Sequence, residues 1–227
     1  MKKSLLILML FILSASLCAQ DEVTKFLGIP VDGNKSEMIK KLKAKGYKSS
    51  LIDKDILVGE FNGTNVNIHI VTKGDKVYRI AVIDANPSSE TDIKIRFNEL
   101  CRQFDRNKKY LSASLSDYTL SEEENISYEM LVQNKRYQAS YYQLPAELDS
   151  TTISKEIELS ILSKYTKEEL PNITEELKKD ILVDTWSTII KKCSMRSVWF
   201  MINKEYSKYY ISIFYDNEYN NAKGEDL

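Results

Sequence analysis

Three runs of alternating apolar and polar residues between Asp55 and Asp84 constrain the fold of this chain more than any other feature. Alternation with a period of two places every second side chain on the same face of a β-strand. In the second run Val66, Ile68 and Ile70 share one face. The pair Asn62-Gly63 before that run is a strong signal for a two-residue hairpin turn, because both residues tolerate positive φ. The segment therefore predicts an antiparallel meander.

Helix signals flank the meander on both sides. Before it, Asn34 is placed to cap a helix with Glu37 three residues later, and Gly46 is placed to end that helix in the left-handed conformation. After it, a second helix is expected to cover the sheet with an apolar stripe at helical spacing. That stripe consists of Ile93, Phe97, Leu100, Cys101 and Phe104.

The second half of the chain repeats the pattern of strands and helices. We expect two further hairpins and a mostly helical stretch between them. The first hairpin joins Ile126–Val132 to Arg136–Gln143 with its turn at Asn134-Lys135, the helical stretch covers Ser150–Cys193, and the last hairpin joins Ser197–Asn203 to Tyr209–Tyr215.

These elements predict an α+β fold in which helices pack on one face of an antiparallel sheet. We expect a signal peptide over residues 1–19, an N-terminal α+β half over 20–118 and a C-terminal α+β half over 119–227. The two halves are expected to be similar helix-plus-meander units, and one continuous domain is the alternative.

The first residues have the pattern of an export signal. Lys2 and Lys3 supply the positive end, Leu5–Leu13 the apolar stretch, and small residues up to Ala19 the cleavage region before Gln20. We therefore expect a periplasmic or extracellular protein. No second apolar run of about 20 residues follows, so no stable membrane span is expected after removal of the signal.

The three cysteines of the chain leave two questions open, a lipid anchor and a disulfide. Cleavage before Cys18 would leave a lipid-anchored protein, although Leu17 is bulkier than the residue usually found at that position. Cys101 and Cys193 are able to form a disulfide in an oxidising compartment. Both lie on apolar stripes of predicted helices, which favours buried thiols instead.

Composition excludes several classes of function. The formal net charge of −1 argues against a general nucleic-acid binder. His69 is the only histidine and alternates with isoleucines in a predicted strand, so a histidine-dependent nucleophile or a zinc site is not expected. No phosphate-binding glycine loop is present, and we expect no cofactor and no catalytic residue of these types. A hydrolase built on two carboxylates is the alternative, because such enzymes need no histidine.

Two groups near the C-terminus are the candidate site residues. Asp216, Glu218 and Asn220 recur at every second position, as in a calcium loop, but the loop glycine and the closing glutamate are missing. Turn chemistry explains their spacing without a metal. Tyr210 and Phe214 are candidate binding residues on one face of the last strand, and burial on both faces is the alternative.

Three sequence blocks carry a resemblance to a known group. Residues 26–47, 93–104 and 209–227 are similar to uncharacterised secreted proteins of Bacteroidales. This resemblance implies an exported bacterial protein and transfers no functional residue. The layout of two helix-plus-meander halves resembles the tandem domains of beta-lactamase-inhibitory-protein-like proteins, a likeness that does not fix function. In such a bacterium Asp149-Ser150-Thr151 resembles an acceptor motif for O-glycosylation.

The sequence therefore favours a non-enzymatic binding or interaction module of the cell envelope. It is expected to present a sheet face or loops to a protein or glycan partner. The alternatives are the carboxylate-based hydrolase and an inhibitor of a secreted enzyme.

Overall fold

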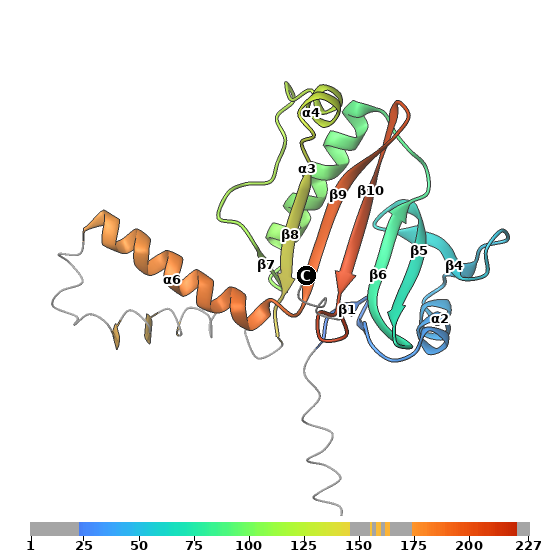
Figure 1. Cartoon of the computed structure of the whole chain (residues 1–227), viewed down its shortest axis with the longest axis horizontal. Coiled ribbons are helices and arrows are strands. Elements are labelled where there is room, and N and C mark those ends of the chain that lie inside the picture. Colours follow the sequence, from blue (N-terminus) through green and yellow to red (C-terminus); the bar gives the residue numbers. More distant parts are fainter. Residues whose placement is uncertain (1–22, 146–154, 156–157, 160–161, 164–173, 222–227) are drawn as a thin grey trace, which may run out of the picture.

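The turn residues Asn62 and Gly63 both adopt positive φ, 52° and 73°, as a two-residue hairpin turn requires. The flanking strands β4 (Ile56–Phe61) and β5 (Thr64–Lys73) pair antiparallel, and β6 (Lys76–Asp84) pairs with β5 in the same way. The predicted meander is confirmed (Figure 1).

This computed structural model describes residues 23–145, 155, 158–159, 162–163 and 174–221. The expected signal peptide with Cys18 and the tripeptide Asp149-Ser150-Thr151 lie outside the described residues. The remaining elements are β1 (Lys25–Phe26), β2 (Ile29–Pro30), α2 (Lys35–Ala44), β3 (Lys48–Ser49), α3 (Glu90–Arg106), β7 (Tyr110–Ser112), α4 (Ile126–Val132), β8 (Gln138–Gln143), α6 (Glu175–Cys193), β9 (Ser197–Glu205) and β10 (Lys208–Asp216).

Eight strands form one antiparallel sheet in the order β3-β4-β5-β6-β10-β9-β8-β7. Along this order, the strands of residues 48–84 form one half of the sheet, and those of residues 110–216 form the other half. The two halves join where β6 pairs with β10, with Ile80 opposite Tyr215 and Val82 opposite Ile213. Both edge strands, β3 and β7, are only two and three residues long. Short edges of this kind limit pairing with other chains.

The helix before the meander has the capping chemistry that the sequence predicts. The Asn34 side chain accepts a hydrogen bond from the Glu37 backbone nitrogen at 2.9 Å, and Leu42 faces the core. Gly46 follows the helix with a φ of 102°, which is accessible to glycine at little cost.

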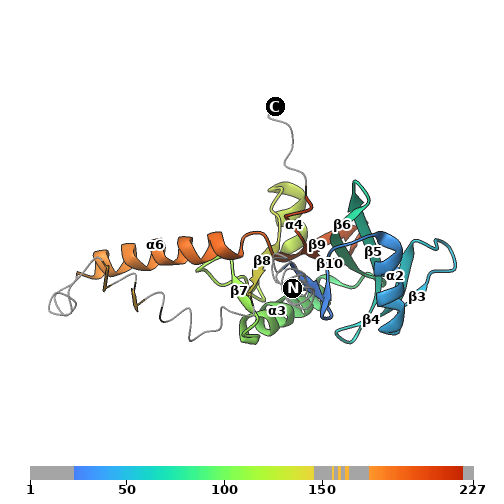
Figure 2. The same ribbon diagram turned by 90° about the horizontal axis from the view of Figure 1, so that it is seen from below.

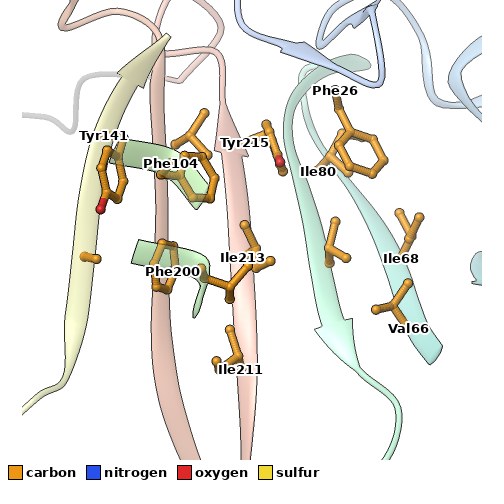
Figure 3. Close-up of a cluster of buried hydrophobic side chains, with 14 of the residues drawn as sticks. Phe26, Val66, Ile68, Ile80, Phe104, Tyr141, Phe200, Ile211, Ile213 and Tyr215 are labelled. Atoms are coloured by element: carbon orange, nitrogen blue, oxygen red, sulfur yellow. The ribbon is translucent and has the colours of Figure 1, made fainter. Parts of the chain in front are cut away.

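Helices α2 and α3 pack on the same face of the sheet, the core face, so the α+β prediction with helices on one face is confirmed (Figure 2). The α3 stripe is buried as predicted. Figure 3 shows the core between this stripe and the strands, with Phe104, Tyr141 and Phe200 as neighbouring rings. Phe104 lies 4.7 Å from Tyr141 and 5.5 Å from Phe200, measured between ring centroids.

The side chains that alternate with the core residues point to the opposite face of the sheet, which α2 and α3 do not cover and which we call the open face. Its central residues are Arg79, Trp199 and Phe214, which neighbour one another across β6, β10 and β9. Helix α6 makes its sheet contacts at β8 and extends away from the sheet (Figure 1).

The predicted hairpin of residues 126–143 is wrong in its first arm and right in its second. The segment Ile126–Val132 forms helix α4, because the Asn125 side chain caps its first turn by accepting a hydrogen bond from the Tyr128 nitrogen at 2.9 Å. Ile126 is buried and Met130, one turn later, packs against the core. The second predicted arm does form a strand, β8, and the final hairpin is confirmed as β9 and β10.

Of the predicted helical stretch of residues 150–193, Glu175–Cys193 forms helix α6, and most of the earlier part lies outside the described residues. Ile189 and Cys193 are buried near the base of α6. Among the described residues, no helix has the combination of length and apolar character needed to cross a bilayer.

The two ends of the described chain are tied together. The Thr24 hydroxyl donates a hydrogen bond to the backbone oxygen of Asp216, and the Asn217 amide nitrogen donates to the Val31 oxygen at 2.8 Å. All four residues are buried. The N-terminal segment is therefore held by the end of the last strand.

Candidate functional site

A groove of about 1010 Å³ lies on the core face, beside the two helices. One wall comes from the turn after α2 and from β4, and the opposite wall comes from the last turns of α3 and the segment that follows it. The β1–β2 hairpin and the end of β8 complete the lining. Ligand pockets in proteins span roughly 300 to 1,000 Å³, so this groove is at the upper end of that range.

Local structure holds two parts of the groove lining in place. The Asn62 side-chain amide donates a hydrogen bond to the Gln103 side-chain oxygen at 2.8 Å and joins the β4–β5 turn to α3. The β1–β2 turn contributes Leu27 and Gly28, with φ of 52° and 80°. Positive φ at both residues is the geometry of a type I′ hairpin turn.

Five aromatic side chains line the groove beside nine polar or charged residues. The aromatic side chains come from five separate segments of the chain and are Tyr47, Phe61, Phe104, Tyr110 and Tyr215. Phe104 and Tyr110 pack edge to face at 4.8 Å between centroids. Rings held in this way form an apolar surface whose shape exists before any ligand arrives.

Three tyrosine hydroxyls in the groove wall are held in place by hydrogen bonds. The Tyr110 oxygen accepts from the Gln143 amide nitrogen at 3.3 Å and is hydrogen-bonded to the Tyr215 hydroxyl. The Tyr47 hydroxyl donates to the Glu60 backbone oxygen at 3.1 Å. Burial raises the pKa of Tyr47, Tyr110 and Tyr215, so all three hydroxyls keep their protons.

Charge on the groove is unevenly distributed. Its lining includes Lys25, Lys45, Lys108 and Lys109 but only one acidic residue, Glu60. The ammonium groups of Lys45, Lys108 and Lys109 form no ion pair within the described part of the chain. The rim is therefore positive, although the formal net charge of the whole chain is −1.

The predicted binding residues Tyr210 and Phe214 lie on the open face, across the sheet from the groove, and both are half-buried. Phe214 stacks on Trp199 with 4.2 Å between centroids. The Arg79 guanidinium lies 4.9 Å from the Phe214 centroid, within the range of a cation–π contact. Tyr210 stands further along β10, opposite Asn203.

The candidate metal residues point to different partners. Asp216 is held by Arg79 through two hydrogen bonds of 2.6 and 2.7 Å. Glu218 accepts a hydrogen bond from the Ser197 hydroxyl at 3.1 Å, and Asn220 donates to a backbone oxygen of β6 at 2.9 Å. No cluster of three histidine, cysteine, aspartate or glutamate side chains that could hold a metal occurs in the described residues.

His69, Cys101 and Cys193 do not belong to the groove lining. His69 is half-buried on the open face opposite Ala81, and its pKa is lowered mainly by burial. Cys101 and Cys193 are both buried and are not joined by a disulfide. Burial also raises the pKa of Cys101 to about 12.

Sequence reasoning missed the groove. Its lining comes from segments far apart in the chain, and no single motif brings Tyr47, Phe61 and Tyr215 together. The adjacent pair Lys108-Lys109 after α3 was the one local signal of a positive rim. No family model, curated protein or solved structure matches this chain.

Proposed function

We propose that this chain is an exported, non-enzymatic binding protein of the cell envelope that holds a ligand with an apolar body in the groove. The observation that carries this proposal is a concave surface of about 1010 Å³, lined by five aromatic side chains together with nine polar or charged ones. Ligand sites bury apolar ligand surface against such rings and use polar groups to orient the ligand. The leader-like first residues support export.

The groove offers little to a carboxylate-based hydrolase. A glycosidase of that type needs two carboxyl groups about 5 to 10 Å apart on either side of the bond to be cleaved. Among the described residues that line the groove, Glu60 is the only one with a carboxylate. Binding without catalysis therefore accounts better for this site.

A neutral fluorescent probe tests binding in the groove. Nile red is expected to gain fluorescence with the mature protein, because its apolar ring system is shielded from water when bound. Gln103→Trp adds a bulky ring to the groove wall and is expected to weaken binding. Arg102→Trp is the matched control, because Arg102 is exposed on the same helix and does not line the groove. Equal binding by both variants would refute the groove as the site.

Export is tested separately. The full chain, expressed with its own first residues in a bacterium, is expected outside the cytoplasm with an intact mass that begins at Gln20. A mass that includes a diacylglycerol on Cys18 would replace the soluble form with a lipid-anchored one. Retention of the complete chain in the cytoplasm would refute export.

The open face is a second candidate for binding, toward a glycan or protein partner. The stacked pair of Trp199 and Phe214 favours it, because half-buried rings on a sheet face that α2 and α3 do not cover are able to stack on a sugar ring or a partner side chain. Phe214→Ala is expected to abolish capture of such a partner from a glycan panel or from culture supernatant. Tyr206→Ala, at the exposed β9–β10 turn, is the control. Unchanged capture by Phe214→Ala would exclude this face.

A further inference from the structure

We propose that the ligand of the groove is an anionic amphiphile, a molecule with an extended apolar body and one negatively charged head group. This inference rests on the proposed binding function and adds the chemical class of the ligand. Two properties of the groove lead to it, the lysines on its rim and the rings along its lining.

The rim lysines select the sign of the head group. Lys45 stands on the α2 side of the groove, and Lys108 and Lys109 stand on the α3 side. A head group between the two sides is therefore within a positive field from both, with Glu60 as the one opposing charge. Because these three ammonium groups form no ion pair within the described residues, an anion gains their attraction without breaking an existing contact.

The groove wall also offers hydrogen-bond donors to an anion. The Tyr110 hydroxyl lines the groove as a group able to donate a hydrogen bond, and its oxygen accepts one from the Gln143 amide nitrogen at 3.3 Å. Tyr110 is half-buried beside Lys109. A neutral phenol next to an ammonium group suits a carboxylate, sulfate or phosphate oxygen, which only accepts hydrogen bonds.

The size and lining of the groove argue against a bare inorganic ion. A sulfate or phosphate ion would occupy a small part of about 1010 Å³ and leave the partly exposed apolar surface of Leu27, Phe61 and Tyr110 in contact with water. An alkyl or aromatic body covers that surface and gains about 25 cal/mol for each Å² of apolar surface removed from water. Both parts of the ligand are therefore needed to use the site.

A series of amphiphiles with the same decyl chain tests the head group. Binding to the mature protein is measured by calorimetry below the micelle concentration of each compound, with decyl sulfate, decanoate, decyl glucoside and decyltrimethylammonium. We expect both anions to bind at least about fivefold more tightly than the neutral glucoside and the cation to bind most weakly. Sodium sulfate alone is expected to give no measurable binding.

Charge-neutralising variants locate the head group. The double variant Lys108→Gln, Lys109→Gln is expected to weaken decyl sulfate about fivefold and to leave decyl glucoside unchanged. The control is Lys40→Gln, Lys41→Gln, which removes the same charge from exposed positions of α2 outside the groove lining. Raising the salt concentration from about 0.05 to 0.5 M should weaken only the anions, because the Debye length shortens below about 10 Å.

Each result bears on a different part of the proposal. Equal affinities for decyl sulfate and decyl glucoside would refute the preference for an anionic head group and leave the groove as a binding site. Equal affinities for decyl sulfate and sulfate ion would refute the need for an apolar body in the ligand. An identical loss in both double variants would place the effect in the overall charge of the protein and overturn the rim assignment. Absence of all amphiphile binding, with Nile red fluorescence that does not depend on Gln103, would refute the proposed function as well.

Discussion

The ion pair between Arg79 and Asp216 predicts a large and asymmetric loss of stability when it is broken. The Asp216 side chain is only 2% exposed, whereas the Arg79 side chain is 26% exposed. The Trp199 indole also donates a hydrogen bond to Asp216, at 2.9 Å. Arg79→Gln therefore leaves a buried carboxylate with one side-chain donor, while Asp216→Asn leaves a guanidinium that water already reaches.

The magnitude follows from these exposures. Removing one partner of a buried ion pair costs about 3 to 5 kcal/mol, because the remaining charge is left without compensation. The Trp199 hydrogen bond and the partial exposure at Arg79 place Arg79→Gln at the lower end, about 3 kcal/mol. For a domain of this size that corresponds to a fall in Tm of roughly 6 to 12 °C. Asp216→Asn is expected to cost less.

Urea unfolding followed by tryptophan fluorescence measures these values, because Trp199 lies within the cluster. The double variant Arg79→Gln, Asp216→Asn is expected to lose less stability than the sum of the two single variants. Lys35→Gln is the control for an exposed pair, since Lys35 and its partner Asp55 are 35% and 66% exposed, and it should cost less than about 1 kcal/mol.

Two results would refute the reasoning. A cost below about 1 kcal/mol for Arg79→Gln would mean that water or a local rearrangement compensates the buried carboxylate. A larger cost for Asp216→Asn than for Arg79→Gln would mean that the hydrogen bonds of Asp216, and not its burial as a charge, dominate the energy of the cluster.

Three further predictions concern single side chains. Iodoacetamide at pH 8 should leave Cys101 unmodified in the native protein and alkylate it in urea, since burial raises its pKa to about 12; fast native labelling would contradict this. Gly59→Ala should cost about 1 to 3 kcal/mol in urea unfolding, because the new Cβ would lie 2.6 Å from the Tyr47 ring; unchanged stability would show that the ring moves away freely. The pKa of Glu124 is lowered mainly by its hydrogen bond with Lys135. The free energy of unfolding of the native protein should therefore exceed that of Glu124→Gln by its full amount above pH 4.5, and the difference should disappear as the pH falls through the folded-state pKa of Glu124. A difference that does not depend on pH would exclude this cause.

Elements with local signals were predictable from the sequence. The Asn34 cap, the Asn62-Gly63 turn and the α3 stripe depend on residues within a few positions of one another. Each signal reflects backbone chemistry that operates whatever the rest of the chain does. The final hairpin was predictable for the same reason, since its two arms are adjacent in sequence.

The segment that became α4 shows the limit of such patterns. Ile126, Tyr128, Met130 and Val132 alternate as a strand would, but Ile126 and Met130 also lie one helical turn apart. Seven residues fit both periods, and the deciding contact is the Asn125 cap together with the burial of Ile126 against the core. Tertiary packing therefore selects the helix.

The groove was beyond sequence reasoning because its residues meet only in the folded chain. Tyr47, Phe61 and Tyr110 each follow or end an ordinary element, and nothing local distinguishes them from core aromatics. The predicted Tyr210 and Phe214 were chosen by alternation, which separates the two faces of a strand but cannot tell which face the helices cover.

The pairing of β6 with β10 has a consequence for how the protein is made. The residues that meet there, such as Val82 and Ile213, are far apart in the sequence, and the same strand end holds Thr24 near the start of the described chain. Contacts of such long sequence separation form late, because the chain must first close a large loop. The sheet is therefore complete only after Asp216 has been synthesised. Strand β6 gains its second neighbouring strand, β10, only after most of the described chain has been made.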